Sequence, residues 1–410
     1  MPRVYLDHAA TTPMLPQAIE AMVEQMKTGG NPSSLHSAGR AARSTVEYAR
    51  ERIAQVAGCD AAEIIFTSGG TEADNLAIKG LYWKRREANP TATRIIVSGI
   101  EHHAVGDAAE WLEAHEGAQI TWLAPDATGR VSAQAVREAV GQNPDTVALI
   151  TVMWANNEVG TVQPIADIAA VAHEHGIPFH TDAVQAFGTL PVNFKESGAT
   201  TMAISAHKIG GPMGVGALIA TRSSQLMPVL HGGGQERSVR SGTIDAASIA
   251  GFGAAAAHAG QNLLAEASRQ AALRDQLIDG VLAAVPQAQL RGAIPEIPQE
   301  RAAGTYQRLP GNAHFTFPGC EGDSLLFLLD MAGVESSTGS ACNAGVPRPS
   351  HVLLAMGLSE GQARGAQRFT LGHTSTEEDI TALLQALPGA WAQAKKAGMA
   401  GHEPDATRWK

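Results

Sequence analysis

Lys208 and Asp182 are the residues whose setting in this 410-residue chain most suggests chemistry. Lys208 lies between the largely apolar segment 200–206 and the Gly-Gly-Pro turn 210–212. Lysines are mostly solvated, but desolvation lowers the pKa of a lysine and makes its neutral amine available for a Schiff base. Asp182 follows the segment 177–181, and a buried carboxylate needs a cationic or donor partner. A protonated pyridine nitrogen would be such a partner, although a helix N-cap or an ion pair explains an isolated aspartate better.

A glycine turn is the third feature with chemical meaning. The segment 66–72, Phe-Thr-Ser-Gly-Gly-Thr-Glu, runs from an expected strand into an expected helix. The free N–H groups at a helix N-terminus suit a phosphate, and the segment lacks the Gly-Lys-Ser/Thr of a Walker loop. An N-cap by Ser68 or Thr71 explains the segment alone equally well. Combined with Lys208 and Asp182, the turn favours a pyridoxal 5′-phosphate site.

The three cysteines, Cys59, Cys320 and Cys342, call for separate interpretations. Their sparse, odd number is a poor disulfide framework, and no pair has the C-x-x-C spacing of a zinc or redox site. We therefore expect a reducing compartment and no metal centre. A buried, inert thiol is the usual interpretation and fits Cys59 and Cys320. Cys342 lies among small residues at 336–345, which predict a flexible, exposed loop, so its thiolate could act as a nucleophile.

The elements that must position these groups alternate between strand and helix patterns from Pro13 to about Ala220. Apolar runs of strand length occupy 63–67, 94–98, 119–123, 147–153, 177–181, 200–205 and 215–220. A first helix is expected where Leu15, Ile19, Met22 and Met26 fall at helical spacing before Gly29, and a second over 41–56 before Gly58. Further helices are expected over 71–85, 105–116, 132–140 and 165–175. This alternation predicts an α/β fold with a doubly wound, mostly parallel sheet.

Polar groups follow five of these strands, where such sheets bind their ligands. They are 68–71, 101–103, 156–158, 182–185 and 205–208. One polar strand end is common in any α/β loop. Five at one edge of a sheet predict a shared pocket.

The character of the chain changes after the Gly-rich stretch 231–234. An Ala-rich helix is expected from 246 to about 285, followed by strands at 313–317, 333–337 and 367–371. We expect a large cofactor-binding domain over 15–260. Residues 1–14 and 261–400 would form a smaller α+β domain carrying the loop of Cys342, and 401–410 a polar tail.

The composition is that of an ordinary globular protein. Hydrophobic residues make up 44% and charged residues 17%, and the formal net charge is −10. Nothing in this balance suggests nucleic acid or anionic membrane as a partner. No apolar run approaches the roughly 20 residues that span a bilayer, and the first residues lack the pattern of a signal peptide. We therefore expect a cytoplasmic protein.

Taken together, the motifs resemble those of the cysteine desulfurases of the class V aminotransferase superfamily. The resemblance covers nearly the whole chain, at 5–12, 67–75, 101–102, 156–160, 182–185, 205–212, 240–243 and 337–342. It implies the type I fold of pyridoxal-phosphate-dependent transferases. The segment around Cys342 resembles the longer active loop of desulfurases that hand sulfur directly to scaffold and carrier proteins.

The resemblance implies roles around the cofactor. Lys208 would hold pyridoxal phosphate as a Schiff base, and Asp182 would pair with its pyridinium nitrogen. His102 would stack on the ring and help move protons, while Gln185 and Asn157 would bond around the ring oxygen and the substrate. The phosphate would be held by Gly70, Thr71, Ser205 and His207, and by Thr243 of a partner subunit, which implies a homodimer.

Arg368 and Cys342 would act on the substrate. A guanidinium suits a two-pronged contact with the substrate carboxylate, although Arg368 could instead be a surface arginine flanking a helix. The Cys342 thiolate would take the sulfur of L-cysteine, leaving L-alanine and a persulfide. A sulfur-acceptor protein, such as an iron–sulfur scaffold, would receive that sulfur.

Two other functions are compatible with these motifs. A selenocysteine lyase or related lyase or transaminase has the same fold, but a transaminase does not need Cys342. A non-catalytic scaffold should have lost Lys208, Asp182 or Cys342, and all three are present. The chain departs from the family pattern at His8, Ala206, Gly211 and Met213, none of which removes a catalytic group.

Overall fold

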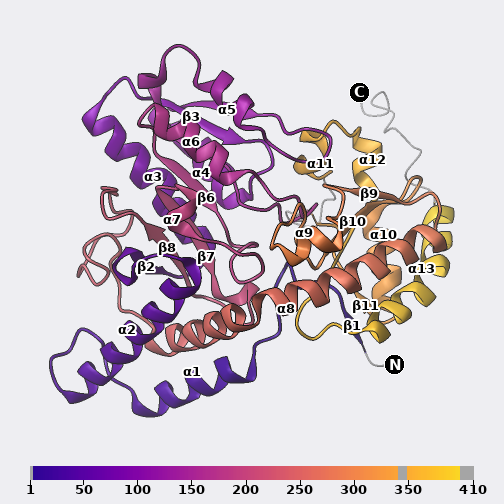
Figure 1. Cartoon of the computed structure of the whole chain (residues 1–410), viewed down its shortest axis with the longest axis horizontal. Helices are drawn as coiled ribbons and strands as arrows, with labels where there is room; N and C mark the ends of the chain where they lie inside the picture. Colours follow the sequence, from indigo (N-terminus) through magenta and orange to yellow (C-terminus); the bar gives the residue numbers. More distant parts are fainter. Residues whose placement is uncertain (1–2, 340–348, 398–410) are drawn as a thin grey trace, which may run out of the picture.

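The structure is a computed structural model that describes residues 3–339 and 349–397. Figure 1 shows two lobes, with the long helix α8 (Ala246–Ala284) running from one to the other. This helix agrees with the one expected over 246–285. The expected domain boundary at residue 260 falls inside it, so the division of the chain into two domains remains a prediction.

The larger lobe is built on a seven-stranded sheet that contains all seven strands expected before residue 220. They are β2 (Ile64–Thr67), β3 (Arg94–Ser98), β4 (Gln119–Leu123), β5 (Val147–Thr151), β6 (Phe179–Asp182), β7 (Thr201–Ser205) and β8 (Gly216–Ala220). Their order is β2-β8-β7-β6-β5-β3-β4. Only the two pairings of β8 are antiparallel, so the expected mostly parallel sheet is confirmed. Two expected boundaries are wrong by two residues: β5 ends at Thr151 rather than at 153, and β6 starts at Phe179 rather than at 177 and includes Asp182. Three other strands start one residue later than expected.

Helices cover both faces of this sheet, as a doubly wound fold requires. The inner residues of each strand alternate between two apolar clusters: Ile65, Ala203 and Leu218 pack with one face, and Phe66 and Ile204 with the other. The first face is covered by α3 (Gly70–Ala88) and α4 (His103–Glu116). The second lies against α2 (Ser37–Ala57), α5 (Ala133–Val140), α6 (Ile165–Glu174) and the first half of α8.

Glycine stops end the first two helices where the sequence predicts them. The helix α1 (Pro16–Thr28) ends before Gly29, and α2 ends before Gly58. Gly58 has a φ of 65°, in the left-handed region that a residue without a Cβ enters at little cost. Its N–H donates to the carbonyl of Ala54 and closes the last turn. A short helix, α7 (Phe194–Ser197), follows later in the same lobe.

The smaller lobe has its own sheets and its own apolar core. Strands β9 (Gln289–Arg291), β10 (Asn312–Thr316) and β12 (Ala366–Thr370) form an antiparallel sheet, and β1 (Val4–Tyr5) pairs in parallel with β11 (Val334–Glu335). The helices are α9 (Pro298–Ala302), α10 (Gly322–Met331), α11 (His351–Ala355), α12 (Glu360–Arg364) and α13 (Glu377–Ala397). Val4 and Leu6 belong to this core, whereas Leu15 belongs to that of the large lobe. The chain therefore crosses between the lobes within residues 7–14.

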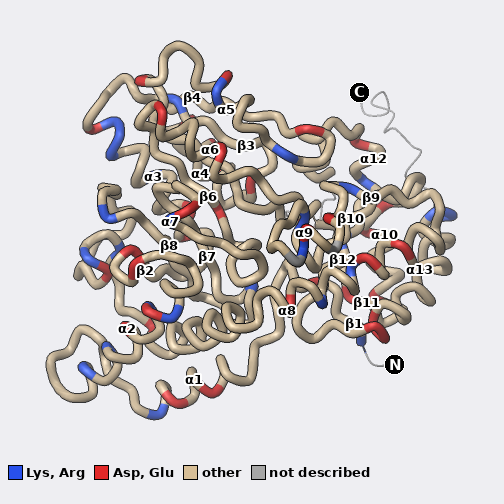
Figure 2. Tube along the Cα trace, viewed as in Figure 1, with Lys and Arg blue, Asp and Glu red and all other residues tan. Residues whose placement is uncertain are grey.

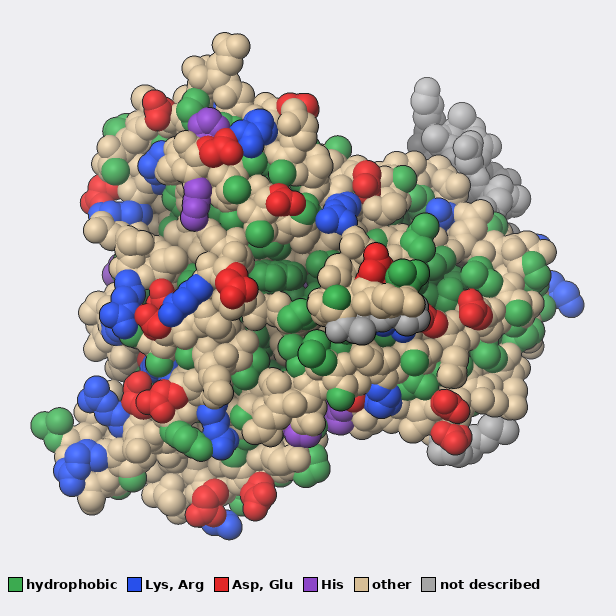
Figure 3. Space-filling view, viewed as in Figure 1, with side chains coloured by type: hydrophobic (Ala, Val, Ile, Leu, Met, Phe, Trp, Pro, Cys, Tyr) green, Lys and Arg blue, Asp and Glu red, His purple; other side chains and the backbone are tan. Residues whose placement is uncertain are grey.

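Charged residues of both signs are mixed over the molecule. Figure 2 shows basic and acidic residues interspersed along the chain in both lobes, and Figure 3 shows apolar side chains gathered where the lobes meet on the face in view. Within residues 3–339 and 349–397, no helix combines the length and apolar character needed to cross a membrane.

Candidate active site

The carboxyl edge of the large sheet brings three of the expected polar groups into contact. A Cβ placed on Gly70 would lie 2.8 Å from a methyl of Val184 and 3.9 Å from Cβ of Ser205. These residues follow or end β2, β6 and β7, which are distant in sequence. The sheet order therefore builds one site from separate strand ends, in the place where parallel sheets bind ligands.

Lys208 is held by the N-terminal segment. The residue belongs to the short 3-10 helix 206–208. Its Nζ donates to the carbonyl oxygens of Ala9, at 2.7 Å, and Ala10, at 2.8 Å. Burial and the positive charge of Arg368 lower the pKa of Lys208 to about 8, against the opposing effect of two carboxylates. A larger share of neutral amine is therefore present near neutral pH than on an exposed lysine. Gln185 donates to the same Ala9 oxygen, at 2.9 Å.

Asp182 is a buried carboxylate at the end of β6. Its Oδ1 accepts from the N–H of Val184 at 2.8 Å. Burial, together with the nearby carboxylate of Asp74, raises the pKa of Asp182 to about 7. A cationic group placed against this carboxylate would lower the pKa again and offset its desolvation. The site therefore suits a protonated ring nitrogen.

The start of α3 and the end of β7 form a cradle for an anion. Gly70 begins α3, whose first N–H groups have no partner inside the helix. Ser205 is buried, and its Oγ has no hydrogen-bond partner among the described residues. A buried hydroxyl without a partner is costly, so a ligand oxygen at this place would satisfy it. These observations fit the phosphate of pyridoxal phosphate, with Gly70 required because any Cβ would collide with Val184.

The other residues expected at the phosphate come from three separate segments of the chain. Thr71 follows Gly70 on α3 and is exposed. His207 lies beside Lys208, and its Nδ1 is 3.3 Å from Oγ1 of Thr11. Burial and the charge of Lys208 lower the pKa of His207 to about 4, so its ring is neutral at physiological pH. Thr243 is exposed in the segment between β8 and α8, and its expected contact requires a second copy of the chain.

His102 has one ring nitrogen engaged and an exposed ring. It caps α4, and its Nδ1 accepts from the N–H of Ala104 at 3.1 Å. Desolvation by the surrounding protein lowers the pKa of His102, and the nearby Asp182 opposes this change. A neutral imidazole whose Nδ1 accepts a bond carries its proton on Nε2. That nitrogen is the one available to a ligand.

Arg368 lies on β12 and is buried, so its interpretation as a helix-flanking surface arginine is wrong. Its Nη2 donates to Oδ1 of Asp7 at 2.8 Å, and its Nη1 to the carbonyl of Asn157 at 2.7 Å. Its Nε has no partner among the described residues. The positive charge of Arg368 lies near enough to Lys208 to lower the pKa of the lysine.

Two of the three cysteines, Cys59 and Cys320, lie among the described residues. Cys342 lies outside the described residues. Cys59 is partly buried and Cys320 buried, and both are free thiols. Burial raises the pKa of Cys59 to about 12 and that of Cys320 to about 11. Thiols with such values carry almost no thiolate at neutral pH, which agrees with the inert role expected for both.

Three carboxylates near this site received no individual role from the sequence: Asp74 and Glu101 are buried, and Asp7 is partly exposed. Asp7 was recognised only as part of a motif, although it holds Arg368. Glu101 accepts from the N–H of Met153 at 2.6 Å through Oε1, while its Oε2 has no partner among the described residues. Asp74 contacts His180 at 3.1 Å behind Asp182. The sequence signals for these three were membership of a family motif and, for Glu101, a place after a predicted strand.

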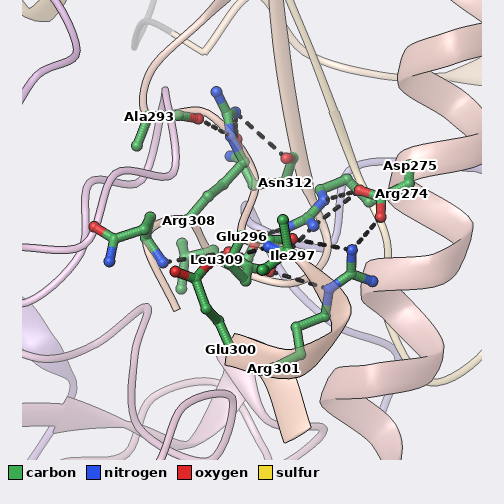
Figure 4. A network of polar contacts seen from close by, with 11 residues as sticks. Arg274, Asp275, Ala293, Glu296, Ile297, Glu300, Arg301, Arg308, Leu309 and Asn312 are labelled. Carbon is green, nitrogen blue, oxygen red and sulfur yellow. Dashed lines mark hydrogen bonds and ion pairs between the residues drawn. The ribbon is translucent and has the colours of Figure 1, made fainter. Parts of the chain in front are cut away.

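A buried polar network supports the loop that carries Asn157. Figure 4 shows Arg308 pointing toward Ala293 and Asn312, next to the ion pairs that Glu296 makes with Arg274 and Arg301. Asn312 in turn donates to the carbonyl of Glu158 at 2.9 Å. The small lobe is thereby tied to the residue directly after Asn157.

A cavity of about 520 Å³ opens beside Lys208. Lys208 and Gln185 border it, together with His258, Arg269 and His373. Asp182, His102 and Ser205 are not among its lining residues, so the cavity is separate from the expected ring and phosphate positions.

Comparisons with known proteins identify the family. Residues 4–383 match the family described as aminotransferase class-V. The chain is 55% identical over 396 residues to a protein of Mycobacterium tuberculosis (strain ATCC 25618 / H37Rv) named IscS-like cysteine desulfurase, covering 97% of this chain and 98% of that protein.

Two solved structures agree with this match. A NifS-like protein from Rickettsia africae ESF-5 has a TM-score of 0.82 at 32% identity, covering 95% of this chain and 99% of that one. A structure titled SspA in complex with cysteine has a TM-score of 0.74 at 37% identity, covering 91% and 99%. The chain therefore belongs to the class V aminotransferase family and, within it, to the cysteine desulfurases.

Proposed function

We propose that this protein is a pyridoxal-phosphate-dependent cysteine desulfurase that converts L-cysteine to L-alanine and passes the sulfur on as a persulfide. The observation that carries the proposal is the joint placement of Lys208 and Asp182. A lysine with a lowered pKa and a buried carboxylate that forms no ion pair with a described residue lie at one strand-end site. Family membership and the names of the relatives support the same activity.

The residues of the site fit the cofactor from end to end. Lys208 would hold its aldehyde carbon, Asp182 its ring nitrogen and His102 its ring face. Gln185 would reach the ring oxygen and Asn157 the substrate. Gly70, Thr71, Ser205 and His207 would hold its phosphate. When bound, pyridoxal phosphate supplies an electron sink for the bonds around the substrate α-carbon.

The protein's own groups then bind the substrate and move its protons. Arg368 would bind the substrate carboxylate, because its guanidinium is buried, immobilised by Asp7 and close to Lys208. Lys208 has a pKa that lets its amine accept a proton and return it near neutral pH. His102 would offer its Nε2, because its Nδ1 already accepts from the N–H of Ala104.

Cys342 would take the sulfur in this proposal. Its thiolate attacks the sulfur of the bound cysteine, and the carbon–sulfur bond breaks with its electron pair retained on carbon. That carbon takes up a proton to give L-alanine, and Cys342 becomes a persulfide. The reaction needs no external oxidant or reductant. The persulfide sulfur would go to an acceptor protein, such as a scaffold for iron–sulfur clusters.

A homodimer in the cytoplasm is part of the same proposal. Thr243 is exposed, which is consistent with a role at the site of a second copy. Ile19, Val23 and Met26 expose an apolar stripe on α1 that a second copy could cover. Light scattering of the purified protein measures its oligomeric state. A Thr243→Ala variant that keeps its affinity for pyridoxal phosphate would contradict the shared site.

One set of variants tests the activity. The wild-type protein should be yellow, form equal amounts of alanine and transferable sulfur from L-cysteine, and carry labelled sulfur on Cys342. Cys342→Ala should keep the cofactor absorbance and lose both products. The matched control Cys320→Ala should keep them, because that thiol is almost fully protonated at neutral pH. A Cys342→Ala protein that makes sulfide at the wild-type rate would overturn the persulfide step. A wild-type protein that binds no pyridoxal phosphate would overturn the enzyme assignment.

A further inference from the structure

A fully buried hydrogen-bonded pair, Asp74 and His180, lies behind the site and has no part in the proposed chemistry. Nε2 of His180 is 3.1 Å from Oδ1 of Asp74, and the two residues are 106 positions apart in the chain. Nδ1 of the same ring is 2.9 Å from Oγ1 of Thr201. The side chains of His180 and Asp74 are 0% and 1% exposed. Both ring nitrogens are therefore engaged, and the imidazole is held in one orientation.

The pair joins the two elements that would hold opposite ends of the cofactor. Asp74 lies on α3, four residues and about one turn after Gly70. His180 lies on β6, two residues before Asp182. Because side chains alternate along a strand, His180 and Asp182 point to the same face of the sheet, the face that α3 covers. The contact therefore connects the start of α3 to the end of β6.

The other groups near Asp182 do not make this connection. Glu101 and His102 follow β3, and Lys208 follows β7. Thr201 is the register partner of His180 on β7 and locks the ring rather than α3. Desolvation raises the pKa of Asp74 and lowers that of His180 to about 4, so burial favours the uncharged form of both groups. Replacement of either partner leaves a buried polar atom unsatisfied.

We propose that Asp74 and His180 are positioning residues that set the distance between the phosphate cradle at the start of α3 and Asp182 at the end of β6. The inference rests on the proposed function, because it assumes that pyridoxal phosphate spans these two places. A ligand held at both ends is sensitive to their spacing, whereas a ligand held at one end is not. An error near 1 Å in such a spacing is enough to cost on the order of 10²-fold.

Two substitutions at His180 separate its two ring nitrogens. A glutamine amide reaches the position of Nε2, so His180→Gln keeps a donor toward Asp74. An asparagine amide reaches only the position of Nδ1, so His180→Asn keeps the contact with Thr201 and loses Asp74. The measurement is the dissociation constant of the cofactor-free protein for pyridoxal phosphate, for pyridoxal and for inorganic phosphate, each followed by absorbance or calorimetry.

The expected result is a selective loss for the ligand that spans both ends. His180→Asn should weaken pyridoxal phosphate by about 10-fold or more and change pyridoxal and phosphate by less than about 3-fold. His180→Gln should restore wild-type affinity within about 3-fold for all three ligands. Asp74→Leu also removes the contact and should repeat the pattern of His180→Asn, so it serves as the test if His180→Asn does not fold.

The inference is overturned if the three ligands weaken together, or if His180→Gln and His180→Asn behave alike. Either result would indicate a role in stability alone, which the unfolding temperature of each variant would also report. A wild-type protein that binds none of the three ligands would overturn the proposed function, and the inference with it. If the wild-type protein binds the ligands and every variant keeps the wild-type ratios among the three dissociation constants, the inference alone is overturned.

Discussion

The guanidinium of Arg368 lies 2.8 Å from the carboxylate of Asp7, although 361 residues separate them in the chain. The same guanidinium donates to the carbonyl of Asn157 at 2.7 Å. Strand β12, the N-terminal segment and the loop after β5 therefore meet at one cation. Strand β12 belongs to the small lobe and the loop after β5 to the large lobe. The position of Arg368 therefore depends on the contact between the two lobes.

The first prediction concerns the substitution Arg368→Lys. Lysine keeps the positive charge but cannot make two parallel bonds to a carboxylate. The KM for L-cysteine should rise by about 10-fold to 100-fold, with a smaller change in kcat, because a charged hydrogen bond to the substrate is lost. Steady-state alanine production measures both constants. Arg364→Lys is the matched control, since Arg364 lies four residues earlier and its only salt bridge within residues 3–339 and 349–397 is a long helical contact with Glu360. An unchanged KM in Arg368→Lys would exclude the carboxylate contact.

The second prediction follows from the lowered pKa of Lys208. With a pKa of about 8, the amine becomes neutral as the pH rises from 7 to 9, well below the range of an exposed lysine. The rate at which the cofactor-free protein captures pyridoxal phosphate should therefore rise over this range with a midpoint near pH 8. Borohydride trapping at each pH measures the captured fraction. Lys195→Ala removes an exposed lysine bound to Asp60 and should leave the profile unchanged, whereas a midpoint near pH 10 would contradict the shift.

Strand positions were predictable because the pattern along a strand is local. The runs at Arg94–Ser98 and Gln119–Leu123 match β3 and β4 residue for residue. Lys208, Asp182 and Ser205 could be identified for the same reason, since each directly follows or ends such a run. The expected strand 333–337 is shorter in the structure, because β11 pairs only along Val334–Glu335.

The partners of buried polar side chains could not be predicted. Asp7 and Arg368 are 361 residues apart, and the packing of the two lobes brings them together. Asp74 and His180 are 106 residues apart, and the packing of α3 on the sheet brings them together. No periodicity distinguishes a paired buried aspartate from an N-cap. The sequence therefore indicated which residues lie at the sheet edge but not what holds them there.

The third prediction tests the network that supports the loop of Asn157. Glu296 is fully buried, and its carboxylate is 3.2 Å from Nη2 of Arg274 and 3.6 Å from Nε of Arg301. The substitution Glu296→Gln leaves two guanidinium groups with only the partly exposed Asp275 as counter-charge and should lower the free energy of unfolding by about 3 kcal/mol. Glu174→Gln breaks an exposed pair with Arg137 and should cost less than about 1 kcal/mol. Urea unfolding compares the two. Equal effects would indicate that burial of the network contributes little.

The fourth prediction concerns Ser205, whose buried Oγ has no partner among the described residues. In the cofactor-free protein this hydroxyl is an uncompensated polar group, so Ser205→Ala should raise the free energy of unfolding by about 1 kcal/mol. The same substitution removes a phosphate ligand and should weaken pyridoxal phosphate by about 10-fold, while leaving pyridoxal unaffected. Thermal unfolding of the cofactor-free protein and titration with the two ligands measure these opposite changes.

Thr181→Val is the matched control for Ser205→Ala. The Oγ1 of Thr181 is also buried without a partner among the described residues, but alternation along β6 places it on the face of the sheet opposite to Asp182. Its loss should change stability in the same direction and leave the affinity for pyridoxal phosphate unchanged. If Ser205→Ala also leaves that affinity unchanged, the phosphate does not contact this hydroxyl. If both variants lose affinity equally, the effect comes from the sheet rather than from the cradle.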